Sequence, residues 1–176
     1  GTRKVTRPGK VVTTFAAGSR RTYDWLADNP IVEMLPVDWV NDPRVIGREQ
    51  RFVSINATVE VDFLGQCNSE TIGGRSYSGS GGQADFARGA MHAAEGQGFV
   101  VLHSTARGGS ISRLVPRLSP GAAVTTDKNT VDKVVTEFGV AELRGRTIEE
   151  RTRALIDIAH PDHRDDLERA AREMDF

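Results

Sequence analysis

Apolar and polar positions follow two repeating patterns along this chain. Residues 99–102 are a continuous apolar run, which is typical of a strand covered on both faces. Residues 52–65 carry the longest strand pattern, in which apolar and acidic side chains alternate at Val59, Glu60, Val61, Asp62 and Phe63. Other segments place apolar residues three and four positions apart, as on one face of a helix.

Shorter elements fill the rest of the chain. Further strands are predicted at residues 11–15, which we expect to be buried, and at 31–35, 111–115 and 122–126. Helices are predicted at residues 19–29, 44–49, 84–96, 129–135, 147–160 and 161–174. The alternation of strands and helices predicts an α/β fold, a layered domain with a mixed, largely parallel sheet flanked by helices.

Residues that favour helix ends support several of these helices. Thr147 and Glu150 have the spacing of a capping box, in which each side chain bonds the backbone N–H of the other residue. Asp42 and Pro43 are a favourable N-cap and first-turn pair for the helix that follows them. Pro161 is likewise a favourable first residue for the last helix.

The two acidic residues of the longest strand pattern lie on the same face. Glu60 and Asp62 are two positions apart, so both side chains point to one side of the predicted strand. Buried carboxylates need partners, because an ionised group is costly to remove from water. We therefore expect this face to be solvated.

The candidate site is the glycine-rich loop at residues 76–82, which leads directly into a predicted helix. Gly79, Gly81 and Gly82 are poor residues for a strand or helix interior, because glycine loses more backbone entropy on ordering than other residues. Without Cβ atoms they let a ligand approach the backbone, and the start of a helix has unpaired N–H groups. The loop is thus suited to an anion or a developing oxyanion. The alternative is a tight surface turn before an ordinary helix.

The common local motifs for nucleotide and nucleophile sites do not occur in this sequence. The loop spacing differs from the G-x-G-x-x-G dinucleotide fingerprint, and no G-x-x-x-x-G-K-[ST] is present. A G-x-S-x-G elbow is also absent from the sequence. Pattern alone therefore leads to an α/β domain with an anion-binding loop.

Arg107 follows the apolar run at residues 99–102. Loops at the carboxyl ends of strands bind ligands in open α/β sheets, so a cation at this position is placed to meet a phosphate. The alternative is an exposed loop charge with no ligand.

The composition is that of an ordinary globular domain. Of its 176 residues, 38% are hydrophobic and 27% are charged, which suits one domain with a core. The formal net charge of −1 gives no electrostatic reason to expect nucleic acid or an acidic membrane as a partner. No apolar run approaches the roughly 18 residues of a membrane span, and no signal-peptide pattern opens the chain, so we expect a cytoplasmic protein.

The reactive and metal-ligating residue types do not form a known pattern. Cys67 is the only cysteine, which excludes an internal disulfide, and we expect it to be a packed residue rather than a nucleophile. The histidines have no H-x-x-x-H or H-E-x-x-H spacing; they are His92, His103, His160 and His163. We therefore predict no metal site.

Five stretches of the sequence carry a resemblance to a known family. They are residues 55–62 (INATVEVD), 77–90 (YSGSGGQADFARGA), 111–116 (ISRLVP), 135–141 (VTEFGVA) and 159–161 (AHP). These stretches resemble the acetyl-CoA hydrolase/transferase family, which includes acetate, succinate, butyrate and 4-hydroxybutyrate CoA-transferases. The similarity extends in order from Gly9 to Met174 and implies a CoA-transferase-like domain.

The resemblance implies a ping-pong transfer of coenzyme A between an acyl-CoA thioester and a small carboxylate. In the family, a glutamate attacks the thioester to give an acyl-glutamyl anhydride and then a glutamyl-CoA thioester, from which CoA passes to the acceptor. By position, Asn41 matches the asparagine that supplies a side-chain N–H to the oxyanion, and Gly82 matches the glycine that supplies a backbone N–H. Coenzyme A is implied as a substrate, and no permanently bound cofactor is expected.

The resemblance also implies contacts with the rest of coenzyme A. Ser78 and Gly81 match loop positions that line its thiol arm, and Thr58 falls near that arm. Arg107 falls where the family commonly has a lysine that contacts CoA. Arginine keeps the charge but replaces a point ammonium with a planar fork, which alters the phosphate contact.

The family's nucleophilic glutamate precedes the strand predicted at residues 11–15, so we expect this chain to lack it. Glu33, Glu60 and Glu70 do not match its position, and none is assigned that role. The nucleophile is therefore expected on a part of the protein upstream of this chain.

Two domain segments are implied by the resemblance. Residues 1–10, which are basic, are expected to be a flexible lead-in from a missing N-terminal domain, and residues 11–176 to be the C-terminal CoA-transferase domain. The chain alone is expected to be inactive and, through exposed apolar surface, to form a homodimer. The alternative is a non-catalytic module of the same fold that binds CoA or a phosphorylated metabolite.

Overall fold

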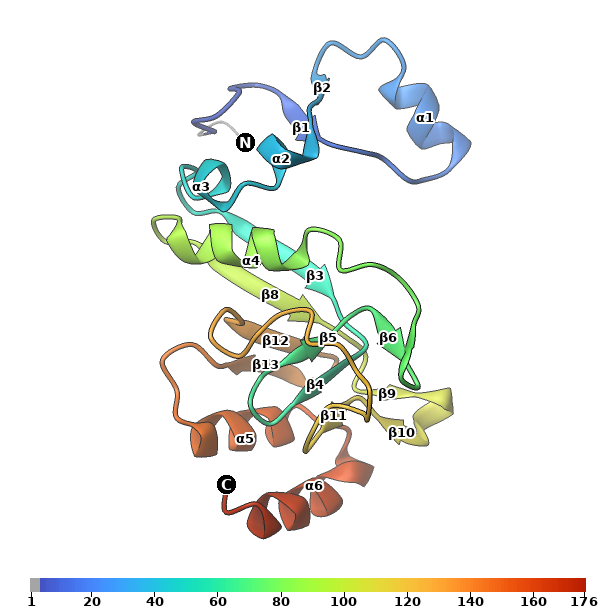
Figure 1. Ribbon diagram of the computed structural model, residues 1–176, viewed down its shortest axis with the longest axis vertical. Helices are drawn as coiled ribbons and strands as arrows, with labels where there is room; N and C mark the ends of the chain where they lie inside the picture. The colour runs from blue at the N-terminus through green and yellow to red at the C-terminus, as the bar shows by residue number, and fades with distance from the viewer. Residues whose placement is uncertain (1–3) are drawn as a thin grey trace.

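A four-stranded sheet forms the centre of the structure, a computed structural model that describes residues 4–176 (Figure 1). In the order β13-β12-β8-β3, its strands are β13 (Gly139–Glu142), β12 (Lys133–Thr136), β8 (Gln97–Val101) and β3 (Val53–Ala57). β3 and β12 are each parallel to β8, and β13 is antiparallel to β12. The prediction of a mixed, largely parallel sheet is confirmed.

Three helices flank this sheet: α4 (Gln83–His92), α5 (Ile148–Asp157) and α6 (Pro161–Glu173). α4 lies along β3 and β8, α5 lies beside β13, and α6 packs on α5 at the C-terminal end (Figure 1). The core forms between the sheet, α5, α6 and nearby loops, and its largest buried side chains include Val61, Phe63, Leu114, Val134, Leu143 and Leu155. None of the helices in residues 4–176 has both the length and the apolar character that a membrane crossing requires.

A second, smaller sheet beside the core consists of β11 (Leu114–Val115), β4 (Glu60–Asp62) and β5 (Cys67–Asn68). The single strand predicted at residues 52–65 is therefore two strands, β3 and β4, in two sheets. The chain leaves the first sheet at Thr58, whose N–H donates to Val101 O at 3.2 Å and whose hydroxyl donates to Asn68 O at 2.7 Å. An alternating pattern reports which faces are buried and does not report this change of direction.

The expectation that Glu60 and Asp62 face solvent is wrong, because β4 is buried along its whole length. Glu60 accepts hydrogen bonds from Asn68 Nδ2 at 2.9 Å, from Ser119 N at 3.1 Å and from the Ser119 hydroxyl at 2.7 Å. Asp62 accepts the backbone and side-chain N–H groups of Gln66, both at 2.8 Å. Burial outweighs these bonds and raises the pKa of Asp62.

Two elements predicted in the second half of the chain are wrong. Residues 122–126 form a loop with one bridge, between Thr126 and Cys67. In place of a helix at residues 129–135 there is a turn, in which the Thr130 hydroxyl donates to Asp127 at 2.8 Å, followed by β12. β12 occupies the sheet position between β8 and β13, so long-range strand pairing overrides the local helical spacing.

The predicted helix ends are confirmed at three helices. Thr147 and Glu150 form both bonds of the capping box at the start of α5, at 3.2 Å and 2.8 Å. Asp42 Oδ1 accepts a backbone N–H at 2.8 Å and caps α3 (Pro43–Ile46). Pro161 is the first residue of α6. These ends depend on side chains within one turn, which is why the sequence reports them well.

The N-terminal part is a thin β-α-β unit at one end of the long axis (Figure 1). It consists of β1 (Val11–Thr13), α1 (Arg20–Leu26) and β2 (Val32–Met34), and α2 (Val37–Val40) follows it. β1 and β2 pair in parallel. The expectation that the first strand is buried is wrong, because Val11 is exposed and α1 buries no residue.

Two small hairpins lie beyond the arrowheads of β3 and β8 (Figure 1). One consists of β6 (Thr71–Ile72) and β7 (Arg75–Ser76) and precedes the glycine-rich loop. The other pairs β9 (Thr105–Ala106) with β10 (Ile111–Ser112) around the 3-10 turn η1 (Arg107–Gly109). The strand predicted at residues 111–115 is thus two short strands, β10 and β11, in different sheets.

Candidate active site

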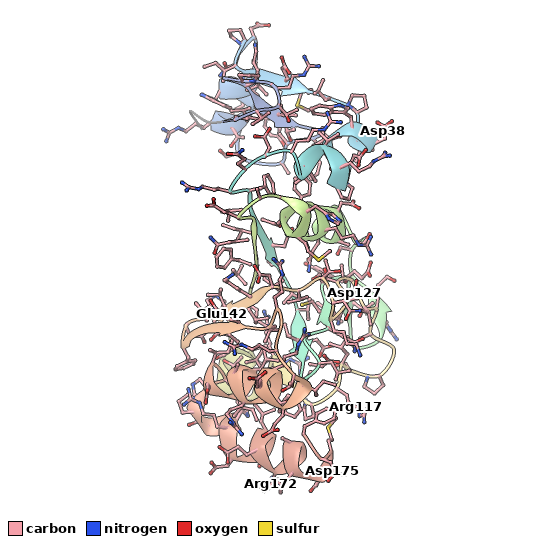
Figure 2. All side chains as sticks on the ribbon, turned by 90° about the vertical axis from the view of Figure 1, so that its left-hand side faces the viewer. Asp38, Arg117, Asp127, Glu142, Arg172 and Asp175 are labelled. Carbon is pink, nitrogen blue, oxygen red and sulfur yellow. The ribbon has the colours of Figure 1, made fainter. Side chains whose placement is uncertain are left out.

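A cleft of about 690 Å³ opens between the N-terminal unit and the start of α4. Its lining comes from the end of β1, from α2 and Asn41, and from Gly81, Gly82 and the first turn of α4. Asp38 of α2 also lines the cleft, and Figure 2 shows it near the end of the molecule opposite Arg172 of α6. Segments that are distant in sequence meet here, which makes this cleft the candidate site.

Asn41 and Gly82 are in close contact in this cleft. A Cβ atom added to Gly82 would overlap Nδ2 of Asn41 and would lie 3.2 Å from Asn41 Cγ. Gly82 has φ −98° and ψ 12°, which other residues also adopt, so the site needs glycine for space rather than for backbone conformation. The close approach brings the Asn41 amide beside the Gly82 backbone.

The start of α4 provides further hydrogen-bond donors. Gly82 is the N-cap of α4 and has no side chain with which to cap it. Neither the Gly82 N–H nor Asn41 Nδ2 donates a hydrogen bond to any group within residues 4–176. The first N–H groups of a helix lack intrahelical acceptors and carry partial positive charge. Donors are therefore available to an oxyanion placed between Asn41 and α4.

Three aspartates, Asp38, Asp42 and Asp85, also line the cleft. Arg44 holds Asp42 through several hydrogen bonds, the shortest joining Nη2 and Oδ2 at 2.7 Å. These bonds hold the pKa of the Asp42 carboxyl below its usual range and raise the pKa of Arg44. Asp42 is thus a paired carboxylate, whereas Asn41 Nδ2 donates to no group in the part of the chain that the structure describes.

Part of the cleft lining was not singled out from the sequence. Its apolar wall consists of Val12, Phe15, Val37, Val40 and Phe86. Asn56 of β3 adds a second amide, whose Nδ2 donates to Ser54 Oγ at 2.9 Å. The position of Asn56 within the stretch at residues 55–62 was the signal that could have found it.

Two more residues implied by the resemblance lie on the glycine-rich loop. Gly81 lines the cleft, and its φ of +57° favours glycine. Ser78 is exposed on the same loop, and its hydroxyl donates to Gly79 O at 3.1 Å. The structure therefore brings Gly81 together with Asn41 and Gly82, while Ser78 lies outside the cleft lining.

Thr58 is buried where the chain leaves β3. Its hydroxyl donates to Asn68 O at 2.7 Å and accepts from the Ser69 hydroxyl at 2.9 Å. These bonds link the end of β3 to the segment that leads toward the glycine-rich loop. Thr58 does not line the cleft.

Arg107 is exposed on η1, outside the cleft lining and beyond the end of β8. The residues that hold this region were not found from the sequence. Glu137 accepts Ser104 N at 2.9 Å and the Ser104 hydroxyl at 2.7 Å. Desolvation alone would raise the pKa of Glu137, but the backbone N–H of Glu137 itself and the two bonds from Ser104 outweigh it, and the pKa is lowered. Ser104 comes shortly after β8 and Glu137 directly after β12, so this pair connects the ends of two parallel strands.

Cys67 is fully buried, which confirms the expectation that it is a packed residue. Burial raises the pKa of its thiol, so it is not activated as a nucleophile. Within residues 4–176, no group of three or more His, Cys, Asp or Glu side chains is arranged to hold a metal ion. The donors of Asn41 and the start of α4 give the cleft the means to donate hydrogen bonds to an anion.

Comparison with known proteins identifies the family. The profile of the family described as "Acetyl-CoA hydrolase/transferase C-terminal domain" matches residues 18–171. The chain belongs to this family. This acetyl-CoA hydrolase/transferase domain is 58% identical over 172 residues to succinyl-CoA:cyclohexane-1-carboxylate CoA transferase of Geobacter metallireducens, with 98% of the chain covered. It is 50% identical over 165 residues to 4-hydroxybutyrate coenzyme A transferase of Clostridium kluyveri, with 94% of the chain covered.

A solved structure has the same fold as this acetyl-CoA hydrolase/transferase domain. RipA from Yersinia pestis superimposes with a TM-score of 0.93 and 44% identity over 99% of this chain and 39% of RipA. The chain spans 39% of the Geobacter relative and 38% of the Clostridium relative. The family resemblance found in the sequence is confirmed, and the domain matches the C-terminal part of longer proteins.

Proposed function

We propose that this chain supplies the oxyanion-stabilising and CoA-binding residues of a CoA-transferase or acetyl-CoA hydrolase, as the C-terminal part of a longer protein. The observation that carries the proposal is the contact between Asn41 and Gly82 at the start of α4. The activities named for the Geobacter and Clostridium relatives support it. An acyl-CoA and a small carboxylate are the proposed substrates, and coenzyme A is a substrate rather than a resident cofactor.

The proposed role of the cleft follows from the chemistry of a thioester. Attack on the thioester carbon moves negative charge onto its carbonyl oxygen. Asn41 Nδ2 and the Gly82 N–H donate to that oxygen, and the partial positive charge at the start of α4 adds to the stabilisation. The attacking glutamate comes from the upstream part of the protein, as the family resemblance implies.

Coenzyme A is an extended molecule, so its thioester and its phosphates meet the protein at different places. We assign the thiol arm to Ser78 and Gly81, with Thr58 near it, and a phosphate to Arg107. The exposure of Arg107 beyond the end of β8 supports this assignment, because guanidinium groups bind phosphate oxygens through two parallel hydrogen bonds.

The test compares two glycines of the same loop in the full-length protein. Gly82→Val places a Cβ against Asn41, whereas Gly79→Val is a matched control because a Cβ at position 79 meets nothing within 4 Å. Loss of one oxyanion donor typically lowers turnover by about 10²–10³-fold. We expect that loss for Gly82→Val with succinyl-CoA and acetate, and near-normal turnover for Gly79→Val. An active, folded Gly82→Val variant would overturn the assignment.

The same assay separates the other possible functions of this domain. Release of CoA without an acceptor carboxylate indicates a hydrolase, and a requirement for acetate indicates a transferase. A full-length protein that binds CoA but turns over no thioester is a non-catalytic module of the same fold. A homodimer remains a prediction, which light scattering on the full-length protein checks.

A further inference from the structure

Arg107 has an uncommon backbone conformation, at the start of a turn that two glycines continue. Arg107, Gly108 and Gly109 have φ values of +49°, +66° and +97° in succession. The left-handed region is uncommon for residues other than glycine, so contacts around the turn must hold Arg107 in it. One such contact is local: the Ser110 hydroxyl donates to Arg107 O at 3.1 Å.

His163 makes a long-range contact with this turn. Its Nε2 lies 2.8 Å from the carbonyl oxygen of Gly109, which is 54 positions earlier in the chain. A carbonyl oxygen only accepts hydrogen bonds, so Nε2 of His163 carries the hydrogen and donates. The imidazole ring is half-buried and packs against His160, with ring centroids 6.1 Å apart.

Helix α6 is a firm support for His163. Leu167 and Ala171 on α6 are buried in the core. Leu167 is four positions after His163, so the two side chains lie on the same face of the helix. Phe138, at the turn between β12 and β13, packs edge-on against His160 at 5.3 Å and holds the start of α6 from another side. The Gly109 carbonyl is thus connected through His163 to the core.

We propose that His163 is a positioning residue for Arg107. By binding the Gly109 carbonyl it holds η1 on α6, and it thereby sets the direction from which the guanidinium meets a phosphate of coenzyme A. The inference rests on the CoA contact proposed for Arg107. It adds a role for helix α6, which contributes no residue to the cleft.

The experiment measures KM and kcat of the full-length protein for succinyl-CoA with acetate as acceptor. His163→Phe keeps a ring and removes the donor, and His163→Ala carries the same prediction should the phenylalanine variant fail to fold. His163→Gln retains an N–H at a similar reach. Asp165→Ala, an exposed position on the same helix, is the matched control.

We expect His163→Phe to raise KM about five- to tenfold, because a tenfold change corresponds to about 1.4 kcal/mol, within the range of one hydrogen bond. kcat stays within about twofold, and His163→Gln restores most of the affinity. In an Arg107→Ala background, His163→Phe adds no further increase in KM, because the group that it positions is gone. Asp165→Ala matches the wild type.

Each other outcome identifies which step is wrong. If the increases in KM caused by Arg107→Ala and His163→Phe multiply in the double variant, His163 does not act through Arg107. If Arg107→Ala raises KM and His163→Phe does not, the positioning role is overturned while the CoA contact stands. If Arg107→Ala leaves KM unchanged, the proposed CoA contact of Arg107 fails.

Discussion

The two ends of the molecule are packed very differently. Ile46 is the first buried residue of the described chain, and no side chain between positions 4 and 45 is buried. From β4 onward, a continuous core runs through both sheets, α5 and α6. In the N-terminal unit, by contrast, Phe15 is 71% exposed and Trp25 is 53% exposed. The N-terminal unit therefore contributes little to the stability of the chain by its own packing.

The candidate site lies at the boundary between these two regions. Asn41 comes from the thin region and Gly82 from the start of a helix that packs on the main sheet. The distance between the two proposed donors thus depends on the less well packed side. Three comparisons between the regions test this view.

The largest expected difference is between a core residue and an aromatic residue of the N-terminal unit. Leu155 is 1% exposed within the core, and Leu155→Ala should lower the free energy of unfolding by about 2–5 kcal/mol, through lost burial and a cavity. Trp25→Ala should lower it by no more than about 0.5 kcal/mol, because the indole is largely in solvent. Urea unfolding of both variants measures the difference. If both substitutions lowered the free energy of unfolding equally, the N-terminal unit would be packed as tightly as the core.

The second expected difference is between a buried carboxylate, Glu60, and an exposed one, Asp24. Glu60→Leu leaves the donors of Asn68 and Ser119 without an acceptor in a buried place, which should cost about 1–3 kcal/mol of unfolding free energy. Asp24 pairs with Arg20 on α1, where both side chains are mostly exposed, and Asp24→Leu should change stability by about 0.5 kcal/mol or less. The same urea assay applies. A small effect of Glu60→Leu means that water reaches this network.

The smallest expected effect concerns the contact that ties Val5 and Thr6 to Glu49, three residues after α3. Glu49 accepts the backbone N–H groups of Val5 at 2.8 Å and Thr6 at 2.6 Å. Desolvation raises the pKa of Glu49, but these bonds outweigh it and the pKa is lowered. A lowered folded-state pKa means that the contact stabilises the fold above the unfolded value and is lost as pH falls through the folded value.

Acidification should therefore release this segment as the pH falls through the lowered folded-state pKa of Glu49. The amide signals of Val5 and Thr6 in NMR spectra should titrate below the ordinary glutamate pKa of 4.5, and Glu49→Gln should remove the titration. Amide signals of β3, which pairs with the backbone of β8, should not shift in that range. A titration midpoint above 4.5 would contradict the proposed cause.

Local signals in the sequence predicted the N-terminal ends of three helices and the loop before α4 correctly, whereas the C-terminal ends of α1, α3, α4 and α5 lie three or four residues earlier than predicted. The capping box at Thr147 and Glu150, the cap at Asp42 and the proline at position 161 all act within one helical turn. The glycine-rich loop does lead into a helix whose N-cap is Gly82. Each of these features depends on residues that are neighbours in the chain, so no tertiary information is needed.

The errors occurred where distant segments decide the outcome. The alternation at Glu60 and Asp62 was read correctly as a strand, but the partners that allow its burial come from Ser119 and other loop residues. The helical spacing before β12 was overridden by pairing with β8 and β13. Local spacing carries no information about such partners.

By itself the sequence determined the α/β class, three helix N-termini and the glycine-rich loop, because composition, periodicity and short motifs report local preferences. The family was reached from the sequence only through the resemblance of five stretches to known CoA-transferases. Only the tertiary structure decided that Asn41 lies against Gly82 and that His163 reaches Gly109. Asn41 and Gly82 are 41 positions apart in the sequence, and Gly109 and His163 are 54 positions apart. These contacts depend on how α2, α4, α6 and η1 pack around the sheet, which no short stretch of sequence specifies.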